Sequence, residues 1–232
     1  MIVLIGVGHV FDISEKVRHE IAAAEPEIVC IELDQDRAKA LLQPNQSKEV
    51  AGRNVPVMYQ MLAVFQKIIA DKFETEPGME MLAAIHAARS LNAKLEFIDI
   101  DAVTIAERIW REMSFVERGK LLASILFGIF LPKKKVEKSI EEFMTAETKV
   151  IEEFGKEFPT LKKILIDDRN DYMAWRISML AKEYTNIVCV VGEGHIDGIS
   201  KKLSQRNLPH RIIHLKQLLS TNNTNYTWSW TW

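Results

Sequence analysis

The chain has 232 residues, 47% of them hydrophobic, which is enough to bury a full core as one domain or as a domain with a large insertion. Thirty Lys and Arg balance 32 Asp and Glu, so a net charge of -2 gives no general attraction to nucleic acid, and no nucleic-acid partner is expected. The longest apolar run, residues 121–132, is shorter than the roughly 20 residues that span a bilayer. Two cysteines in strand-like runs, Cys30 and Cys189, and a start without the basic region of a signal peptide favour a cytoplasmic protein with buried thiols.

Short apolar runs alternate with helical patterns along the chain, which predicts an α/β fold. The first two runs enclose a helical stripe of Val17, Ile21 and Ala24, which Asp12 or Ser14 can cap and Pro26 ends. This order is typical of a βαβ unit with parallel strands. Strands are expected at residues 2–7, 28–33, 95–99, 187–191 and 210–215. Helices are expected between the first two strands, over residues 56–73, 78–91, 103–112, 114–130 and 133–156, from Pro159 onward, and over 196–205.

We therefore expect a central mixed, largely parallel sheet built from the N- and C-terminal parts of the chain, with a large α-helical insertion. One domain should cover residues 1–219, with the insertion at about 103–184 and a flexible tail at 220–232. The irregular stretch 41–55 is expected to be a loop that could cover a site. The insertion carries more apolar side chains than a monomer's surface normally shows, which predicts a homodimer through Trp110, Phe115, Leu122, Phe127 and Phe130.

Two similar segments each place a histidine directly after an apolar run. They read Gly6-Val7-Gly8-His9 and Gly192-Glu193-Gly194-His195, and their glycines predict a tight turn after each strand. Neither has the third glycine of a dinucleotide fingerprint or the Gly-Lys-Ser/Thr ending of a P-loop. Because open α/β sheets bind ligands at the carboxyl ends of their strands, we expect both imidazoles in one pocket. A structural, hydrogen-bonded histidine is the alternative for either one alone.

Glu32 ends the second apolar run, where a carboxylate needs a partner or a metal. It is expected to pair with Arg37 or Arg169, or to serve as a metal ligand or general base. Together with Glu80, in the first turn of the helix over 78–91, and the two histidines, it gives the donor types that zinc, manganese or cobalt prefer.

Arg169 is expected to orient Glu32 or to stabilise an oxyanion in acyl transfer, whereas Arg176, on the same helix face, is expected in a surface ion pair. A basic cluster, Lys133-Lys134-Lys135, fits the solvated start of a helix better than contact with an anionic membrane. The remaining histidines are expected to be structural or exposed: His19, His86, His210 and His214.

Taken in order, several motifs of the chain resemble those of the TraB family, which includes the pheromone-shutdown proteins and is related to the Tiki proteases and the erythromycin esterases. The resemblance runs from about residue 2 to 215. Its motifs are Gly6-Val7-Gly8-His9, Ile31-Glu32-Leu33-Asp34-Gln35-Asp36-Arg37, Gly78-Met79-Glu80-Met81-Leu82-Ala83-Ala84, Asp99 with Thr104 and Arg108, Asp168-Arg169-Asn170-Asp171-Tyr172-Met173, and Val191-Gly192-Glu193-Gly194-His195-Ile196-Asp197-Gly198-Ile199.

The resemblance implies an α/β fold of two similar halves, with both Gly-x-x-His motifs, an acidic pair and an arginine at one site. It implies site roles for His9, Glu32, Glu80, Arg169 and His195. The chain departs from the family at Ile100, where an arginine usually follows the strand-end aspartate. Many family members continue into hydrophobic C-terminal segments, so a longer natural chain could associate with a membrane through a region absent here.

The Tiki branch implies a metal-dependent peptidase, and the esterases imply a histidine that acts on water without a metal. The leading hypothesis is a hydrolase in which a metal or a histidine activates water, Glu32 or Glu80 moves the proton, and Arg169 stabilises the oxyanion on a peptide or ester carbonyl. The alternatives are a metal-independent, esterase-like hydrolase and a non-catalytic peptide-binding or regulatory protein. Bound metal and measurable hydrolysis would separate them.

Overall fold

A computed structural model describes residues 1–8, 13–43, 78–130 and 154–220, and the fold below refers to these ranges. Several predicted features lie outside them: His9, nearly all of the loop over 41–55, the helix over 56–73, the lysine cluster at 133–135, almost all of the helix over 133–156, and all but the first residue of the tail. The expected capping residue Asp12 also lies outside the described residues.

Five strands form one sheet in the order β3-β2-β4-β1-β5, and every neighbouring pair is parallel. The strands are β1 (Ile2–Val7), β2 (Ile28–Ile31), β3 (Lys94–Phe97), β4 (Ile187–Gly192) and β5 (His210–Ile213). The predicted α/β fold with a sheet built from both ends of the chain is confirmed, and the described part of the sheet is wholly parallel rather than mixed. In the sheet centre Cys30 lies beside Cys189, and both thiols are buried and free.

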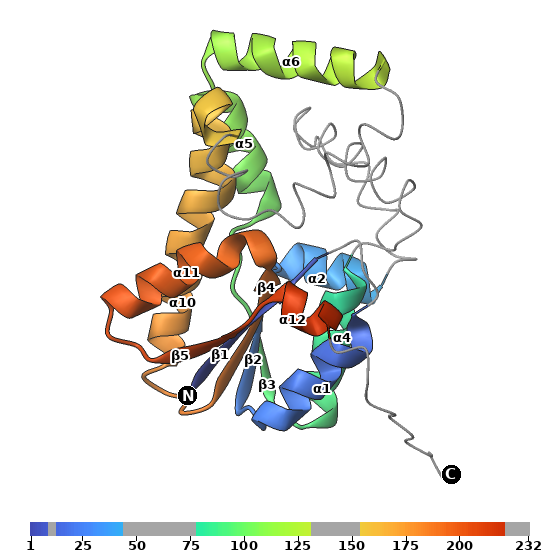
Figure 1. The fold of residues 1–232 in the computed structure, drawn as a ribbon, viewed down its shortest axis with the longest axis vertical. Helices are drawn as coiled ribbons and strands as arrows, with labels where there is room; N and C mark the ends of the chain where they lie inside the picture. Colours follow the sequence, from blue (N-terminus) through green and yellow to red (C-terminus); the bar gives the residue numbers. More distant parts are fainter. Residues whose placement is uncertain (9–12, 44–77, 131–153, 221–232) are drawn as a thin grey trace.

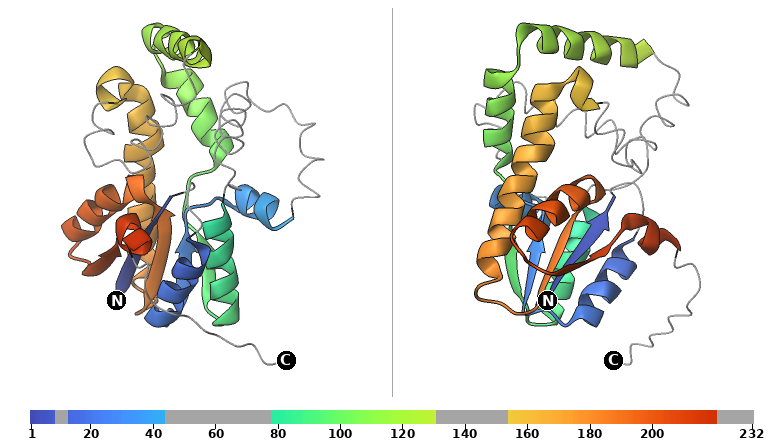
Figure 2. Two further views of the ribbon diagram at one scale, coloured as in Figure 1. Left: turned by 45° about the vertical axis from the view of Figure 1, so that its right-hand side comes forward. Right: turned by 60° about the vertical axis from the view of Figure 1, so that its left-hand side comes forward.

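Helices cover both faces of the sheet, which explains why its central strands are apolar on both sides. The helices α1 (Ser14–Ala24) and α4 (Met79–Ser90) cover one face, and α10 (Asp168–Leu180) and α11 (Glu193–Gln205) cover the other (Figure 2). Successive residues of β1 alternate between the two cores, since Val3 and Ile5 pack with α1 while Ile2 and Leu4 pack with α10 and α11. The edge strand β3 is only half-buried.

The helices differ from expectation at one helix start and by two additional short helices. The first helix ends as predicted before Pro26, with Glu25 in the left-handed region at φ 46°. Ser14 does not cap this helix from outside, because it is the first helical residue. The short helices α2 (Gln35–Leu42) and α12 (Leu215–Ser220) were not expected. The last strand consequently ends at Ile213, since the chain turns into α12 there.

The inserted helices form a lobe beyond the carboxyl edge of the sheet (Figure 1). It contains α5 (Ala102–Glu112), α6 (Phe115–Phe130), α9 (Pro159–Lys162) and a π-helix, η2 (Lys163–Asp167), that continues into α10. The lobe has its own small core, made by Ile105, Ile109, Met113, Leu161 and Ile164. The first two helices match the predicted ranges, whereas the π-helix has no counterpart in the sequence pattern. Among the described helices, none combines the length and apolarity that crossing a membrane requires.

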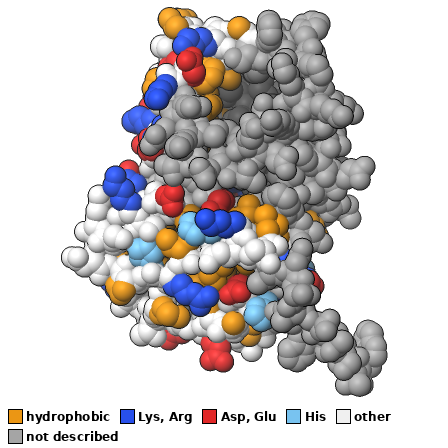
Figure 3. All heavy atoms as spheres, viewed as in Figure 1, with side chains coloured by type: hydrophobic (Ala, Val, Ile, Leu, Met, Phe, Trp, Pro, Cys, Tyr) orange, Lys and Arg blue, Asp and Glu red, His pale blue; other side chains and the backbone are white. Residues whose placement is uncertain are grey.

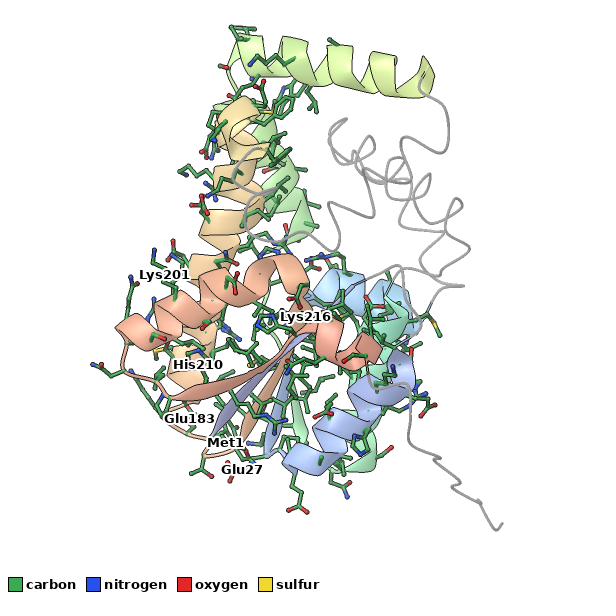
Figure 4. All side chains as sticks on the ribbon, viewed as in Figure 1. Met1, Glu27, Glu183, Lys201, His210 and Lys216 are labelled. Atoms are coloured by element: carbon green, nitrogen blue, oxygen red, sulfur yellow. The ribbon has the colours of Figure 1, made fainter. Side chains whose placement is uncertain are left out.

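The connections that follow two neighbouring strands diverge at the carboxyl edge of the sheet. The chain leaves β1 for α1 on one face, and it leaves the neighbouring β4 for α11 on the opposite face. Such a divergence of neighbouring strands is where open α/β sheets place their ligands. Figure 4 marks the two edges: Met1, Glu27 and Glu183 lie at the amino edge, while Lys216 lies on α12, which follows the carboxyl end of β5.

Candidate active site

Glu32 and His195 meet at the carboxyl edge, between β2 and β4. Glu32 directly follows β2, and its Oε2 accepts a hydrogen bond of 2.6 Å from the backbone amide of Gly192, the last residue of β4. The helix α11 begins at Glu193, so His195 lies in its first turn and not in the tight turn that the glycines suggested. The imidazole Nε2 of His195 lies 3.4 Å from Oε1 of Glu32.

Both side chains are buried, and their surroundings set their charges. Burial raises the pKa of Glu32, but His195, Arg169 and the Gly192 amide together outweigh it and leave the pKa below its ordinary value. Burial lowers the pKa of His195, although the nearby Glu32 carboxylate opposes this shift. Near neutral pH the pair therefore consists of an ionised carboxylate and a neutral imidazole.

Arg169 holds Glu32 in place from α10. Its Nη2 donates to Glu32 Oε1 and, at 2.7 Å, to Asp99 Oδ2, while its Nε donates to Asp99 Oδ1 at 2.9 Å. Its Nη1 donates at 3.1 Å to the backbone carbonyl of Leu165, which lies in the π-helix. Every nitrogen of this guanidinium thus bonds to a protein acceptor. Of the two predicted roles, orientation of Glu32 is the one for which contacts exist.

Asp99, two residues after β3, extends this charge network from Arg169 to Arg37 at the start of α2. Its side chain is fully buried, and although burial raises its pKa, the charges and hydrogen bonds of Arg169 and Arg37 lower it to about 2. Arg37 pairs with Asp99 and, at 2.6 Å, with Asp34, so it is not the partner of Glu32. Asp34 also caps α2 through the amides of Asp36 and Arg37. The network connects the start of α2 to Arg169, the residue that orients Glu32.

Asn170 is the residue of this site that the sequence analysis did not single out. It follows Arg169 on α10, and its Oδ1 lies 2.7 Å from Nδ1 of His195. The contact is buried, since Asn170 is 4% and His195 5% exposed. A signal was present in the sequence, because Asn170 stands beside Arg169 in the motif Asp168-Arg169-Asn170-Asp171.

The other predicted site residues are only partly placed together. Glu80 lies buried in the first turn of α4, a helix that packs against β2 and β3, and His9 lies outside the described residues. Arg176 does not reach the site, because it pairs with Glu96 on β3, in the kind of partly exposed ion pair expected for it. Within the described ranges, no group of three or more His, Cys, Asp or Glu side chains has an arrangement suited to a metal ion.

Two histidines expected to be structural or exposed take part in hydrogen bonds near β5. His210 shares a hydrogen bond of 2.7 Å with Ser200 of α11, and its Nδ1 lies 2.9 Å from the carbonyl of Leu208. His214 lies 2.7 Å from Glu193, which also accepts the backbone amide of Leu215. These contacts join α11 to both ends of the edge strand.

Comparison with known proteins places the chain in a family. The model of the TraB/PrgY/gumN family matches residues 1–208. An uncharacterized protein of Methanocaldococcus jannaschii is 30% identical over 213 residues, which cover 88% of this chain and 53% of that protein. The chain thus spans about half the length of this relative. With nearly its whole α/β core inside the matched region, the chain belongs to the TraB/PrgY/gumN family.

Proposed function

We propose that the chain is a hydrolase in which Glu32 and His195 activate water for attack on a peptide or ester carbonyl. The observation that supports this proposal most strongly is the distance of 3.4 Å between Nε2 of His195 and Oε1 of Glu32, at the carboxyl edge of the sheet, where α/β folds bind ligands. The resemblance to the Tiki proteases and erythromycin esterases implies chemistry on carbonyl groups, and the chain's membership of the TraB/PrgY/gumN family is consistent with it.

The protonation states suit two electron-pair donors that face the same point. Glu32 is ionised at neutral pH because its pKa is lowered, and His195 is neutral because burial lowers its pKa. With Nδ1 of His195 facing the amide oxygen of Asn170, its Nε2 is free to present a lone pair toward Glu32. Two acceptors that face each other repel unless a cation, a proton or a water molecule lies between them. The pair can therefore bind a cation or a water molecule between Nε2 of His195 and the carboxylate of Glu32.

A divalent metal fits this donor pair. Nitrogen and oxygen ligands at about 2.0–2.2 Å from a tetrahedral zinc are separated by about 3.4 Å, close to the distance of 3.4 Å between these two atoms. Glu32 and His195 would hold the metal, together with Glu80 and His9, the other two ligands of the predicted set. Zinc, manganese or cobalt would supply Lewis-acid activation of water or of the substrate carbonyl.

Arg169 acts in this proposal as a positioning residue. Its guanidinium donates to Glu32, to Asp99 and to the carbonyl of Leu165, so the orientation of the Glu32 carboxylate is fixed from one side by the arginine. The Gly192 amide fixes it from the other side. Held in this way, the carboxylate can accept a proton from water without first reorganising.

The test is elemental analysis of the purified chain, followed by a hydrolysis assay on peptide and ester libraries before and after chelation and re-addition of zinc, manganese or cobalt. We expect bound metal and a rate that falls on chelation and returns with metal. Substitution His195→Ala should remove both metal and activity, whereas Glu32→Gln should retain part of the metal and lose most of the rate, since an amide can coordinate but cannot accept a proton.

The matched control is Glu96→Gln, which removes a half-buried carboxylate from the Arg176 ion pair and should leave metal and rate unchanged. Hydrolysis that survives complete removal of metal would favour the metal-independent, esterase-like alternative. An absence of hydrolysis with metal bound would favour a peptide-binding or regulatory protein.

A further inference from the structure

We infer that Asn170 is a positioning residue that holds His195 in the tautomer with hydrogen on Nδ1, so that Nε2 is the atom presented to Glu32. The inference deepens the proposed function, on which its catalytic meaning rests. Its structural content, the tautomer of one buried imidazole, can be measured without any substrate.

The inference rests on the contact between the two side chains. Nδ1 of His195 lies 2.7 Å from Oδ1 of Asn170, and an amide oxygen can only accept a hydrogen bond. With this oxygen as the acceptor, the hydrogen resides on Nδ1, which leaves the lone pair of the neutral ring on Nε2. In the opposite tautomer Nε2 would donate to Glu32, and two lone pairs would face each other at the buried contact with Asn170.

The packing of α10 against α11 keeps the Asn170 amide at this place. A Cβ atom built on Gly198 of α11 would lie 2.0 Å from Nδ2 and 2.7 Å from Cγ of Asn170. Glycine inside a helix is destabilising relative to alanine, so its presence here needs a structural reason. The reason is that Asn170 occupies the space that any other side chain at position 198 would need.

The same two helices are joined at the surface by an ion pair between Lys202 and Asp171. Asp171 follows Asn170 directly, but its side chain is 59% exposed and bonds to Lys202 and not to His195. It therefore provides a control position in the same helical turn, where replacing the carboxylate by an amide leaves the contacts of the imidazole unchanged.

The tautomer can be read from the nitrogen chemical shifts of the imidazole, because a protonated ring nitrogen resonates well upfield of an unprotonated one. We would label the full chain with ¹⁵N-histidine, remove metal by chelation, record long-range ¹H–¹⁵N spectra at pH 8, and assign His195 among the six histidines from a His195→Gln spectrum. In the wild type we expect Nδ1 to be protonated and Nε2 unprotonated.

Three variants and one control, Asp171→Asn, test the cause. Asn170→Ala removes the acceptor and should shift His195 to a mixture or to the Nε2-protonated form. Gly198→Ala should shift it in the same direction while keeping the asparagine, because the new methyl group displaces the amide. Asn170→Asp preserves an acceptor of nearly the same shape and should preserve the hydrogen on Nδ1. Asp171→Asn should leave the spectrum unchanged.

The outcomes separate this inference from the proposed hydrolase. An Nε2-protonated ring in the wild type would overturn it, since the amide of Asn170 would then donate to Nδ1 through its nitrogen. An unchanged tautomer in both Asn170→Ala and Gly198→Ala would overturn it as well. The expected spectra together with an absence of any hydrolysis would uphold the positioning role and refute only the proposed reaction.

Discussion

Removal of the Arg169 side chain should destabilise the protein far more than removal of Arg176, two turns further along the same helix. The substitution Arg169→Met leaves Glu32 and Asp99 without their shared partner, and their side chains are only 11% and 0% exposed. Breaking a buried pair in this way costs about 3–5 kcal/mol, because a charge stays buried without compensation. Arg176→Met breaks a pair whose side chains are 30% and 33% exposed, and such pairs are worth about 0–1 kcal/mol.

The pH dependence of the effect follows from Asp99. Its pKa is lowered from 3.8 to about 2, a shift worth about 2 kcal/mol of stability. Since the pKa is depressed in the folded state, this contribution is fully present above pH 3.8 and is lost as the pH falls toward 2. The difference between the wild type and Arg169→Met should therefore be largest near neutral pH and should narrow below pH 4.

Urea denaturation followed by circular dichroism measures both quantities, with midpoints compared at equal slope. The two arginine variants and the wild type are measured at pH 7 and at pH 3. Equal losses for Arg169→Met and Arg176→Met at pH 7 would refute the assignment of Arg169 as the clamp of two buried carboxylates. A difference that does not narrow in acid would show that Asp99 is not part of that clamp.

Three further predictions concern other parts of the molecule. Asp99→Asn should remove about 2 kcal/mol of the wild type's acid-dependent loss of stability between pH 4 and 2, as measured by urea denaturation; an unchanged profile would contradict the lowered pKa. Gly6→Ala should lower the free energy of unfolding by about 1–3 kcal/mol, because its Cβ would lie 2.0 Å from Oε2 of Glu193. Gly119→Ala, in open space on α6, should leave the free energy of unfolding unchanged or raise it by about 0.5–1 kcal/mol, as measured by thermal denaturation. Light scattering should give twice 26.6 kDa for the wild type and a single mass for Phe115→Glu, since we propose a homodimer through the lobe; a monomeric wild type would end that proposal.

The surface that motivates the dimer lies at the outer end of the lobe. Trp110, Phe115 and Val116 are 52%, 87% and 70% exposed there, and Figure 3 shows hydrophobic side chains at this end of the molecule. The guanidinium of Arg118 stacks on both aromatic rings, at 4.7 Å from that of Trp110 and 5.3 Å from that of Phe115. The predicted contribution of Leu122, Phe127 and Phe130 concerns side chains that the structure does not describe.

The sequence predicts the sheet well because its signals are local. Runs such as residues 2–7 and 187–191 are apolar on both faces, and this pattern identifies central parallel strands wherever they pair. The position of Glu32 at the end of β2 follows from the same pattern, as does its need for a partner. The parallel order of the strands then places Glu32 and His195 at one edge.

The parts that could not be predicted depend on contacts between distant elements. Arg37 and Arg169 were equal candidates for Glu32, and only the packing of α10 over the sheet decides for Arg169. The glycines around position 193 suggested a turn, but helix α11 begins there, which moves His195 into a helical turn. Asn170 has no signal beyond its place next to Arg169, because its role depends on the contact between α10 and α11 at Gly198.

The central claim is that Glu32 and His195 act on the same water molecule, and a double-mutant comparison of hydrolysis rates tests it most directly. On the peptide or ester that the wild type cleaves best, kcat/KM is measured for Glu32→Gln, His195→Gln and the double variant. Residues that act as a unit are strongly non-additive, so the double variant should be no slower than the slower single variant. Losses that multiply, or a wild type that cleaves no peptide or ester with metal supplied, would contradict the claim.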